Sequence, residues 1–321
     1  MTSGRHGLGT DFEAYKSTGW IRLAKEELLR SFFEKVRPVP AAHKVSVIVT
    51  RKDRILDIGC GPPDYFLKVW DNDQSDVTGL DAKLGESQAT LPANRRVIED
   101  NIFNFLDTPF DVIHATSALT WMMAPRDDGT DVRSEFWAKI YGLLAEGGWF
   151  IACHPGSVDY FPDFNKLIVH SLRKMKHPLG EGKAYFEKRA GYVAPQKISD
   201  LMDACPKAGL RIHLLTNSLE WLPIKQSDYI SYWESGGKGW MMNALENNAE
   251  LYECFRSHFQ EAIIDPTILD RLGITSYKKE GEQYLLLPTW WQYLIAQKTE
   301  SEVASRNVNV TWESLKSSVA T

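Results

Sequence analysis

The sequence predicts an α/β fold with a Rossmann-like, seven-stranded, mostly parallel sheet, helices on both faces and a helical insert. Between residues 54 and 153, short apolar runs alternate with amphipathic segments. Each run is nearly continuously apolar, which is typical of strands covered by helices on both faces. A length of 321 residues is enough for one large domain or for a core that carries an insert.

Five of the expected strands lie in this region. They are residues 54–59, 76–81, 95–100, 110–116 and 148–153. Residues 62–71 and 132–144 lie between them and show the spacing of apolar residues that predicts helices. Right-handed crossover connections would then arrange the strands in an open parallel sheet.

The rest of the chain predicts an organisation around this core of residues 51–156. Residues 1–10 are expected to be flexible, 11–50 to form helices over the sheet edge, 157–298 to form the insert and last strands, and 299–321 to be a disordered tail. The insert region predicts helices at 160–177, 195–209, 227–236 and 248–263, with a glycine-rich connection at 178–191. Strands are expected at 210–222 and 284–298, the latter antiparallel, with Pro288 marking an edge or a bulge.

Composition argues against several classes of protein. The formal net charge of -5 disfavours a nucleic-acid partner, since phosphate binding needs a concentrated basic surface. No apolar run is long enough to predict a membrane span, and the first ten residues lack the apolar centre of a signal peptide. The four cysteines are scattered, which disfavours disulfides and a metal site and favours a reducing cytoplasm.

The segment "RILDIGCGPPDYF" reads as a buried strand followed by a ligand-binding turn. Gly59 and Gly61 let the backbone approach a ligand at the start of a helix. A dinucleotide fingerprint needs a third glycine, but Asp64 stands in its place and would repel a pyrophosphate. The pattern therefore favours a ligand with a nucleoside but no phosphate, and S-adenosylmethionine meets this requirement.

Three later loops offer partners for such a ligand. Asp81 ends the second expected strand, where a carboxylate can accept hydrogen bonds from both ribose hydroxyls. Asp100 or Asn101 follows the third strand and can bond the adenine amino group, while Ile102 offers the ring an apolar face. Ala115 and Thr116 end the fourth strand, at the edge where open α/β sheets bind ligands.

With these residues in place, the chain resembles the class I S-adenosylmethionine-dependent methyltransferases from about Arg54 to Cys153. The resemblance is carried by "ILDIGCGP", "TGLDA" and "FDVIHATSALTWM", and the order of pieces is similar to the trans-aconitate and juvenile hormone acid methyltransferase group. It implies glycines against the methionine part, a carboxylate on the ribose and the "EDNIF" loop around adenine. The expected cofactor-binding residues are Asp57, Gly59, Cys60, Gly61, Asp81, Ala82, Asp100, Asn101, Ile102, Ala115 and Tyr15. Pro63 and Asn101 depart from the group's usual glycine and aspartate.

The expected reaction is methyl transfer to a small organic acceptor, with a carboxylate oxygen as the leading acceptor because it needs no general base. If the acceptor is instead a phenol or a hydroxyl, His154 at the end of the fifth strand is the candidate base. The alternative for His154 is a polar residue that satisfies the backbone at a strand end. Trp121, His154, Arg189 and Tyr192 are the expected acceptor-binding residues, and no metal is expected.

Two other functions remain open at this point. One is a nicotinamide-dependent oxidoreductase on a similar sheet, against which Asp64 argues. The other is a protein that binds the cofactor but transfers no methyl group, which the departures at Pro63 and Asn101 leave open. The sequence leaves the oligomeric state undecided.

Overall fold

A computed structural model describes residues 53–63, 66, 75–84, 90–123, 126, 128–155, 162–192 and 198–299. The chain divides into two compact units. The described parts of the first, the sheet unit, lie within residues 53–154, 196–217 and 292–299. Those of the second, the helical unit, lie within residues 155–195 and 218–291. The predicted segments 1–10 and 11–50, and the tail beyond Thr299, lie outside the described residues.

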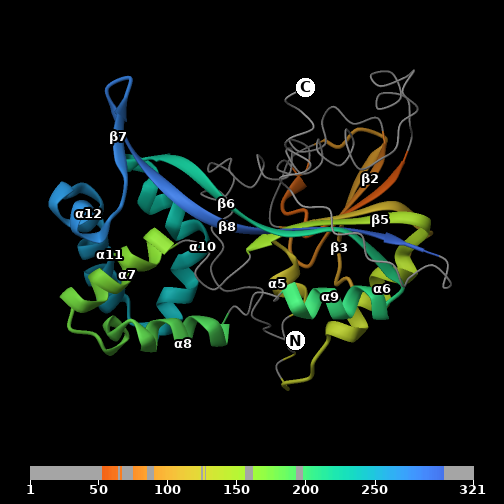
Figure 1. Cartoon of the computed structure of the whole chain (residues 1–321), viewed down its shortest axis with the longest axis horizontal. Coiled ribbons are helices and arrows are strands. Elements are labelled where there is room, and N and C mark those ends of the chain that lie inside the picture. Colours follow the sequence, from red (N-terminus) through yellow and green to blue (C-terminus); the bar gives the residue numbers. More distant parts are fainter. Residues whose placement is uncertain are drawn as a thin grey trace. The chain divides into compact units, whose positions relative to one another are not determined.

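The sheet has the strand order β3-β2-β1-β4-β5-β8-β6, with β7 paired to β8 outside this path. Its strands are β1 (Arg54–Ile58), β2 (Asp76–Asp81), β3 (Arg95–Glu99), β4 (Phe110–Thr116), β5 (Leu144–Pro155), β6 (Leu210–Lys225), β7 (Ser276–Lys279) and β8 (Glu282–Lys298). The pairs β1–β2, β2–β3, β1–β4 and β4–β5 are parallel. The arrows in Figure 1 show β8 running opposite to β5. The predicted α/β fold with a mostly parallel sheet is confirmed, and its seven-strand path is extended by the short β7.

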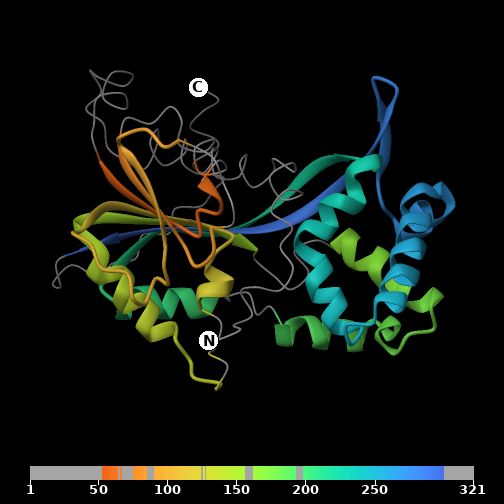
Figure 2. The same ribbon diagram turned by 180° about the vertical axis from the view of Figure 1, so that it is seen from behind.

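Successive side chains along each strand point to opposite faces of the sheet, and different segments of the chain cover the two faces. Leu56, Ile58, Ile113 and Ala115 join one buried cluster with residues of α6 (Arg133–Leu143) and α9 (Ile198–Lys207). Both views show α6 and α9 on the same side of the sheet (Figures 1 and 2). On the other face, a Cβ added at Gly79 would lie 3.0 Å from the ring of Phe66, which belongs to the helix after β1. The Phe66 N–H donates to the Pro62 carbonyl at 3.0 Å, as in a helical turn.

The helical unit contains α7 (Pro162–Lys174), the 3₁₀ turn η4 (Pro178–Glu181), α8 (Lys183–Tyr192), the 3₁₀ turn η5 (Gln226–Asp228), α10 (Tyr229–Ala244), α11 (Ala249–Ile264) and α12 (Pro266–Leu272). Closely packed aromatic rings form its centre. The Phe164 ring lies 4.6 Å from that of Tyr229, and the Trp233 ring lies 5.0 Å from that of Phe259. Asn248 caps α11 by accepting hydrogen bonds from the N–H groups of Glu250 and Leu251 at 3.0 and 3.1 Å.

The structure departs from the sequence expectation at three places in this unit. The glycine-rich segment 178–191 contains η4 and most of α8 and is not a plain connection. Its Gly180 packs so closely on α7 that an added Cβ would lie 2.8 Å from the Arg173 nitrogen, so this glycine serves packing. The other two departures are α12 and β7, which the sequence analysis did not predict.

Candidate cofactor site

The turn after β1 has the backbone conformation that its two glycines suggest. Gly59 and Gly61 have φ angles of 68° and 71°, in the left-handed region that glycine adopts without strain. The Gly59 N–H donates to the Leu80 carbonyl at 2.7 Å, which ties the turn to the end of β2. Cys60 between them is fully buried.

Gly59 is also required by the close approach of the segment that follows β4. A Cβ added at Gly59 would lie 2.5 Å from the Cβ of Ala118 and 3.6 Å from the terminal methyl of Met122. Real Cβ atoms do not approach one another so closely, and the left-handed φ would add strain. The absence of a side chain at Gly59 therefore lets the segment after β4 pack directly against the turn.

Asp81 joins the ends of β1 and β2 through its carboxylate. One oxygen accepts from the Gly61 N–H at 2.9 Å and the other accepts from the Lys83 N–H at 3.1 Å. A carboxylate has about four lone-pair positions, so this type of group can accept more than two hydrogen bonds. The side chain is half-buried, and its neighbour Ala82 is exposed.

The loop after β3 is ordered by its own polar side chains. The Asp100 carboxylate accepts from the Asn101 N–H at 2.7 Å, and the Asn101 side-chain carbonyl accepts from the Phe103 N–H at 3.1 Å. The Asp100 N–H donates to the Asp81 carbonyl at 3.0 Å, so this loop lies beside the end of β2. Ile102 is buried. Asp81 and Asn101 thus lie at one edge, and their contacts with a ribose and an adenine remain predictions.

A buried polar chain lies beneath the glycine turn, and the sequence analysis found only its two ends. Asp57 on β1 is opposite His114 on β4 in the parallel register. The Asp57 carboxylate lies 2.8 Å from His114 Nδ1, and His114 Nε2 lies 3.0 Å from the Thr116 hydroxyl. Asp57 and His114 are fully buried. Asp57 therefore braces β1 against β4, and its predicted contact with the cofactor stays a prediction.

A second polar group lies where β4 and β5 end. Ser117 has a φ of 57°, unusual for a residue other than glycine, and its N–H donates to the Cys153 carbonyl at 2.7 Å. His154 is fully buried, and burial lowers its pKa to about 4 while the neighbouring Gln292 amide opposes the shift. Gln292 Nε2 donates to the Asn217 side-chain oxygen at 3.2 Å. Sequence reasoning found His154 but not Gln292 or Asn217, because neither carries a local motif.

The remaining predicted acceptor-binding residues are placed only in part. Arg189 on α8 stacks over the Trp240 ring at 5.1 Å, within the helical unit. Trp121 lies in α5 (Leu119–Met122) and Tyr192 ends α8. Their side chains, like Tyr15, lie outside what the structure describes. Lys183 forms a surface ion pair with Glu187 at 3.5 Å.

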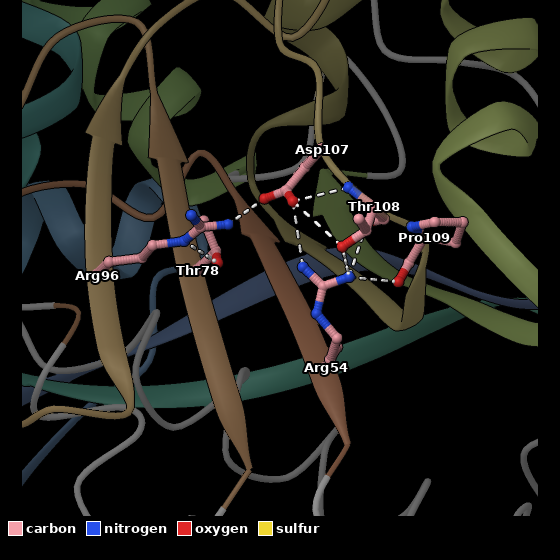
Figure 3. A network of polar contacts seen from close by, with 6 residues as sticks. All are labelled: Arg54, Thr78, Arg96, Asp107, Thr108 and Pro109. Carbon is pink, nitrogen blue, oxygen red and sulfur yellow. Dashed lines mark hydrogen bonds and ion pairs between the residues drawn. The ribbon is translucent and has the colours of Figure 1, made fainter.

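The opposite edge of the sheet, where the strands begin, is held by an ionic network (Figure 3). Asp107 lies between Arg54, at the start of β1, and Arg96 on β3, and it forms an ion pair with each. Arg54 also donates to the carbonyls of Thr108 and Pro109 at 2.9 and 2.8 Å. Burial would raise the pKa of Asp107, but the Thr108 N–H and the two arginines outweigh it and lower the pKa. This network fastens the sheet away from the cofactor edge.

The described residues contain no cluster of metal-ligating side chains. They also contain no helix that is long and apolar enough to cross a membrane. The cysteines Cys60, Cys153, Cys205 and Cys254 are all free thiols, with the first three buried.

Comparison with known proteins finds a family model that matches part of the chain. Residues 56–152 match the family model of a methyltransferase domain. No curated protein matches the sequence. The match covers β1 to β5 with the glycine turn and Asp81, and the strand order continues this sheet to β8 and β6. This match supports an S-adenosylmethionine-dependent methyltransferase.

Solved structures with a similar course of the chain share little sequence with it. The cyclopropane synthase MmaA2 from Mycobacterium tuberculosis is 15% identical, with a TM-score of 0.42 over 90% of this chain and 99% of that one. Coclaurine N-methyltransferase, bound to N-methylheliamine and S-adenosylhomocysteine, is 13% identical, with a TM-score of 0.43 over 86% and 72%. Phosphoethanolamine N-methyltransferase 2 from Haemonchus contortus is 12% identical, with a TM-score of 0.41 over 91% and 58%. At such distances a shared acceptor does not follow.

The cofactor of this class is S-adenosylmethionine, and the residues at the edge fit it. Gly59 has the left-handed φ that this turn requires and is only partly buried, so part of its surface is accessible at this edge. The Asp81 carboxylate is of the chemical type that accepts hydrogen bonds from ribose hydroxyls.

Proposed function

We propose that this protein transfers a methyl group from S-adenosylmethionine to an oxygen of a small organic acceptor, a carboxylate or a hydroxyl. The observation that carries the proposal is the hydrogen bond between the glycine turn and Asp81, in which the Asp81 carboxylate accepts from the Gly61 N–H at 2.9 Å. That bond would hold a ribose acceptor directly beside the glycine turn. The likeness to the trans-aconitate and juvenile hormone acid methyltransferase group is part of the same proposal.

Within this proposal each part of the edge has one task. Asp81, with Ala82 beside it, receives the ribose hydroxyls. Gly59, Cys60 and Gly61 offer backbone to the methionine portion, with Ala115 at the end of β4. Asp100, Asn101 and Ile102 surround the adenine. The bound cofactor supplies a methyl group on a positively charged sulfur, and Tyr15 and Trp121 are the candidate aromatic rings for that charge.

The acceptor half is proposed to lie in residues 157–298. Arg189 is the candidate partner for an anionic acceptor because a guanidinium binds a carboxylate with two parallel hydrogen bonds. Tyr192, Trp121 and His154 complete the proposed acceptor contacts. The protein's task is to align the acceptor oxygen with the methyl carbon at roughly 3 Å in a site that excludes water. We also propose that the enzyme works in the cytoplasm, without nucleic acid.

The test is methyl transfer measured with radiolabelled S-adenosylmethionine across a panel of small carboxylic acids, phenols and alcohols. Asp81→Asn is the informative variant, since an amide keeps the size of the side chain but replaces one acceptor oxygen with a donor. Asp76→Asn is the matched control, because Asp76 lies on the same strand at its exposed beginning. We expect Asp81→Asn to weaken cofactor binding about 10- to 100-fold, the loss of one or two hydrogen bonds to a charged group.

Three results would contradict the proposal. Equal cofactor affinity in Asp81→Asn and wild type would mean that Asp81 does not bind the ribose. Tight binding of S-adenosylmethionine with no labelled product from any acceptor would favour a protein that binds the cofactor without transferring the methyl group. Binding of NADH, with no binding of S-adenosylmethionine or S-adenosylhomocysteine, would favour an oxidoreductase.

A further inference from the structure

Three adjacent strands present a row of polar side chains at the edge of the sheet unit. His154 ends β5, Gln292 lies on β8 and Asn217 lies on β6, and these strands are neighbours in the order β5-β8-β6. Alternation puts His154 on the face of Ala152, two residues earlier, and Gln292 on the face of Leu294. Both Ala152 and Leu294 belong to the buried cluster that packs on α6 and α9. The row is thus the polar end of a continuous apolar core.

The buried members of this row have unused hydrogen-bonding atoms. Neither ring nitrogen of His154 has a hydrogen bond of good geometry in the described residues, and the same holds for Gln292 Oε1. His154 and Gln292 are both fully buried. Two further hydroxyls near the end of β4, those of Ser117 and Thr120, also lack a partner among the described residues. Buried polar groups are nearly always paired, so such a cluster indicates an absent polar partner.

The unused atoms define the chemistry of that partner. Gln292 Nε2 is committed to Asn217, so the free atom beside His154 is the acceptor Oε1. A neutral imidazole has one donor and one acceptor nitrogen. When its N–H donates to Gln292 Oε1, the other nitrogen is an acceptor and requires a ligand that donates. A hydroxyl meets this requirement, whereas an ionised carboxylate has only acceptor oxygens.

The charge around His154 agrees with a neutral ligand. Burial lowers the pKa of His154 to about 4 and the Gln292 amide opposes this shift, with no charged side chain of the described residues among its causes. The imidazole is therefore neutral at pH 7, and it offers no positive charge to a carboxylate. Ser117 stands at the same edge with a left-handed backbone, and strain of this kind is concentrated at ligand sites.

From the row His154–Gln292–Asn217 we infer that the methyl acceptor is a neutral molecule whose hydroxyl donates to His154, with Gln292 as the residue that positions the imidazole. This inference rests on the proposed function and narrows its acceptor to hydroxyl compounds. The acceptor oxygen bonds to the methyl carbon as the carbon–sulfur bond breaks, and the bonding pair returns to sulfur. The hydroxyl proton passes to His154, which releases it to solvent. Because the imidazole is fully covered here, an acceptor must displace neighbouring side chains to reach it.

The test follows His154 by NMR in protein labelled with carbon-13 at histidine Cε1 and saturated with S-adenosylhomocysteine. The probes are phenol and cyclohexanol, each set against the carboxylate of the same skeleton, benzoate and cyclohexanecarboxylate. His154→Gln assigns the resonance. His213, which lies on β6 four residues before Asn217, is the internal control.

We expect phenol or cyclohexanol to shift the His154 resonance saturably, and the carboxylates and the His213 resonance to show no such change. Gln292→Leu should weaken this effect at least 10-fold while leaving S-adenosylhomocysteine affinity unchanged. A larger effect from a carboxylate, or no effect from either hydroxyl probe, would overturn the inference. Failure to bind S-adenosylhomocysteine at all would instead overturn the proposed function, so the two failures are distinct.

Turnover gives a second readout. With any hydroxyl compound that is methylated, His154→Gln should lower kcat by about 10²- to 10⁴-fold, the usual contribution of a general base. Gln292→Leu should lower kcat less and should leave KM for the cofactor unchanged. Equal kcat in wild type and His154→Gln would refute the proton transfer to this residue.

Discussion

The buried His154 makes the stability of this protein depend on pH in a way that can be calculated. Burial lowers the pKa of His154 from 6.5 to about 4, with no exposed surface on the residue. As the pH falls below 6.5, the unfolded chain gains a proton at this position and the folded chain does not. The folded state is then progressively disfavoured, until protonation of folded His154 near pH 4 ends the effect.

The magnitude follows from the size of the shift. Each pKa unit corresponds to about 1.4 kcal/mol, so the full effect below pH 4 is about 3.4 kcal/mol. Between pH 7.5 and pH 5.0 the loss from this residue is about 2 kcal/mol. His154→Gln removes the titrating group and retains a polar side chain of similar length.

The assay is urea unfolding of wild type and His154→Gln at pH 7.5 and 5.0. The difference in the free energy of unfolding between the two proteins should move by about 2 kcal/mol in favour of the variant as the pH falls. Contributions from His170, His213 and Asp107 are common to both proteins and cancel in this difference. If the free energy of unfolding changed equally with pH in wild type and His154→Gln, the argument would be refuted. That result would mean that His154 has the same pKa in the folded and unfolded states.

Three other predictions concern parts of the fold that need no ligand. Gly59→Ala should lower the free energy of unfolding by about 1–3 kcal/mol and abolish cofactor binding. A second substitution in the same chain, Ala118→Gly, removes the clashing methyl group and should therefore recover part of the stability. If urea unfolding of the double variant showed no recovery, the clash would be contradicted. Asn248→Ala should destabilise the protein by about 1 kcal/mol through loss of the α11 cap, with unchanged cofactor affinity by calorimetry. Asp107→Asn should destabilise it by about 1–2 kcal/mol at pH 7. Because folding lowers the pKa of Asp107, the stabilisation by its carboxylate is lost as the pH falls below about 4. The difference in the free energy of unfolding between wild type and Asp107→Asn should therefore shrink in acid, and a difference that grew would be inconsistent with the network in Figure 3.

Local pattern was sufficient for the strands that form the centre of the sheet. The runs that became β2 and β4 were predicted with the bounds that the structure shows, because buried parallel strands are continuously apolar and end abruptly at polar residues. The glycine turn and Asp81 were found for the same reason, since each directly follows such a run. Glycine content misled the prediction for residues 178–191, where Gly180 provides close packing and α8 follows directly.

The polar pairs of the site depend on information that no local pattern contains. His114 meets Asp57 only because β1 and β4 are neighbours in one particular register. Gln292 meets Asn217 because β8 lies between β5 and β6, although 75 residues separate the two in sequence. Side chains that share a row across a sheet are set by strand order and register, which are properties of the whole fold.

The central claim is that the edge formed by the glycine turn and Asp81 holds S-adenosylmethionine. Calorimetric titration of wild type, Asp81→Asn and the control Asp76→Asn with S-adenosylmethionine and S-adenosylhomocysteine tests it most directly. We predict micromolar binding of both ligands by wild type and the control, and binding weaker by about 10- to 100-fold in Asp81→Asn. Absence of binding to wild type, or equal binding by all three proteins, would contradict the claim.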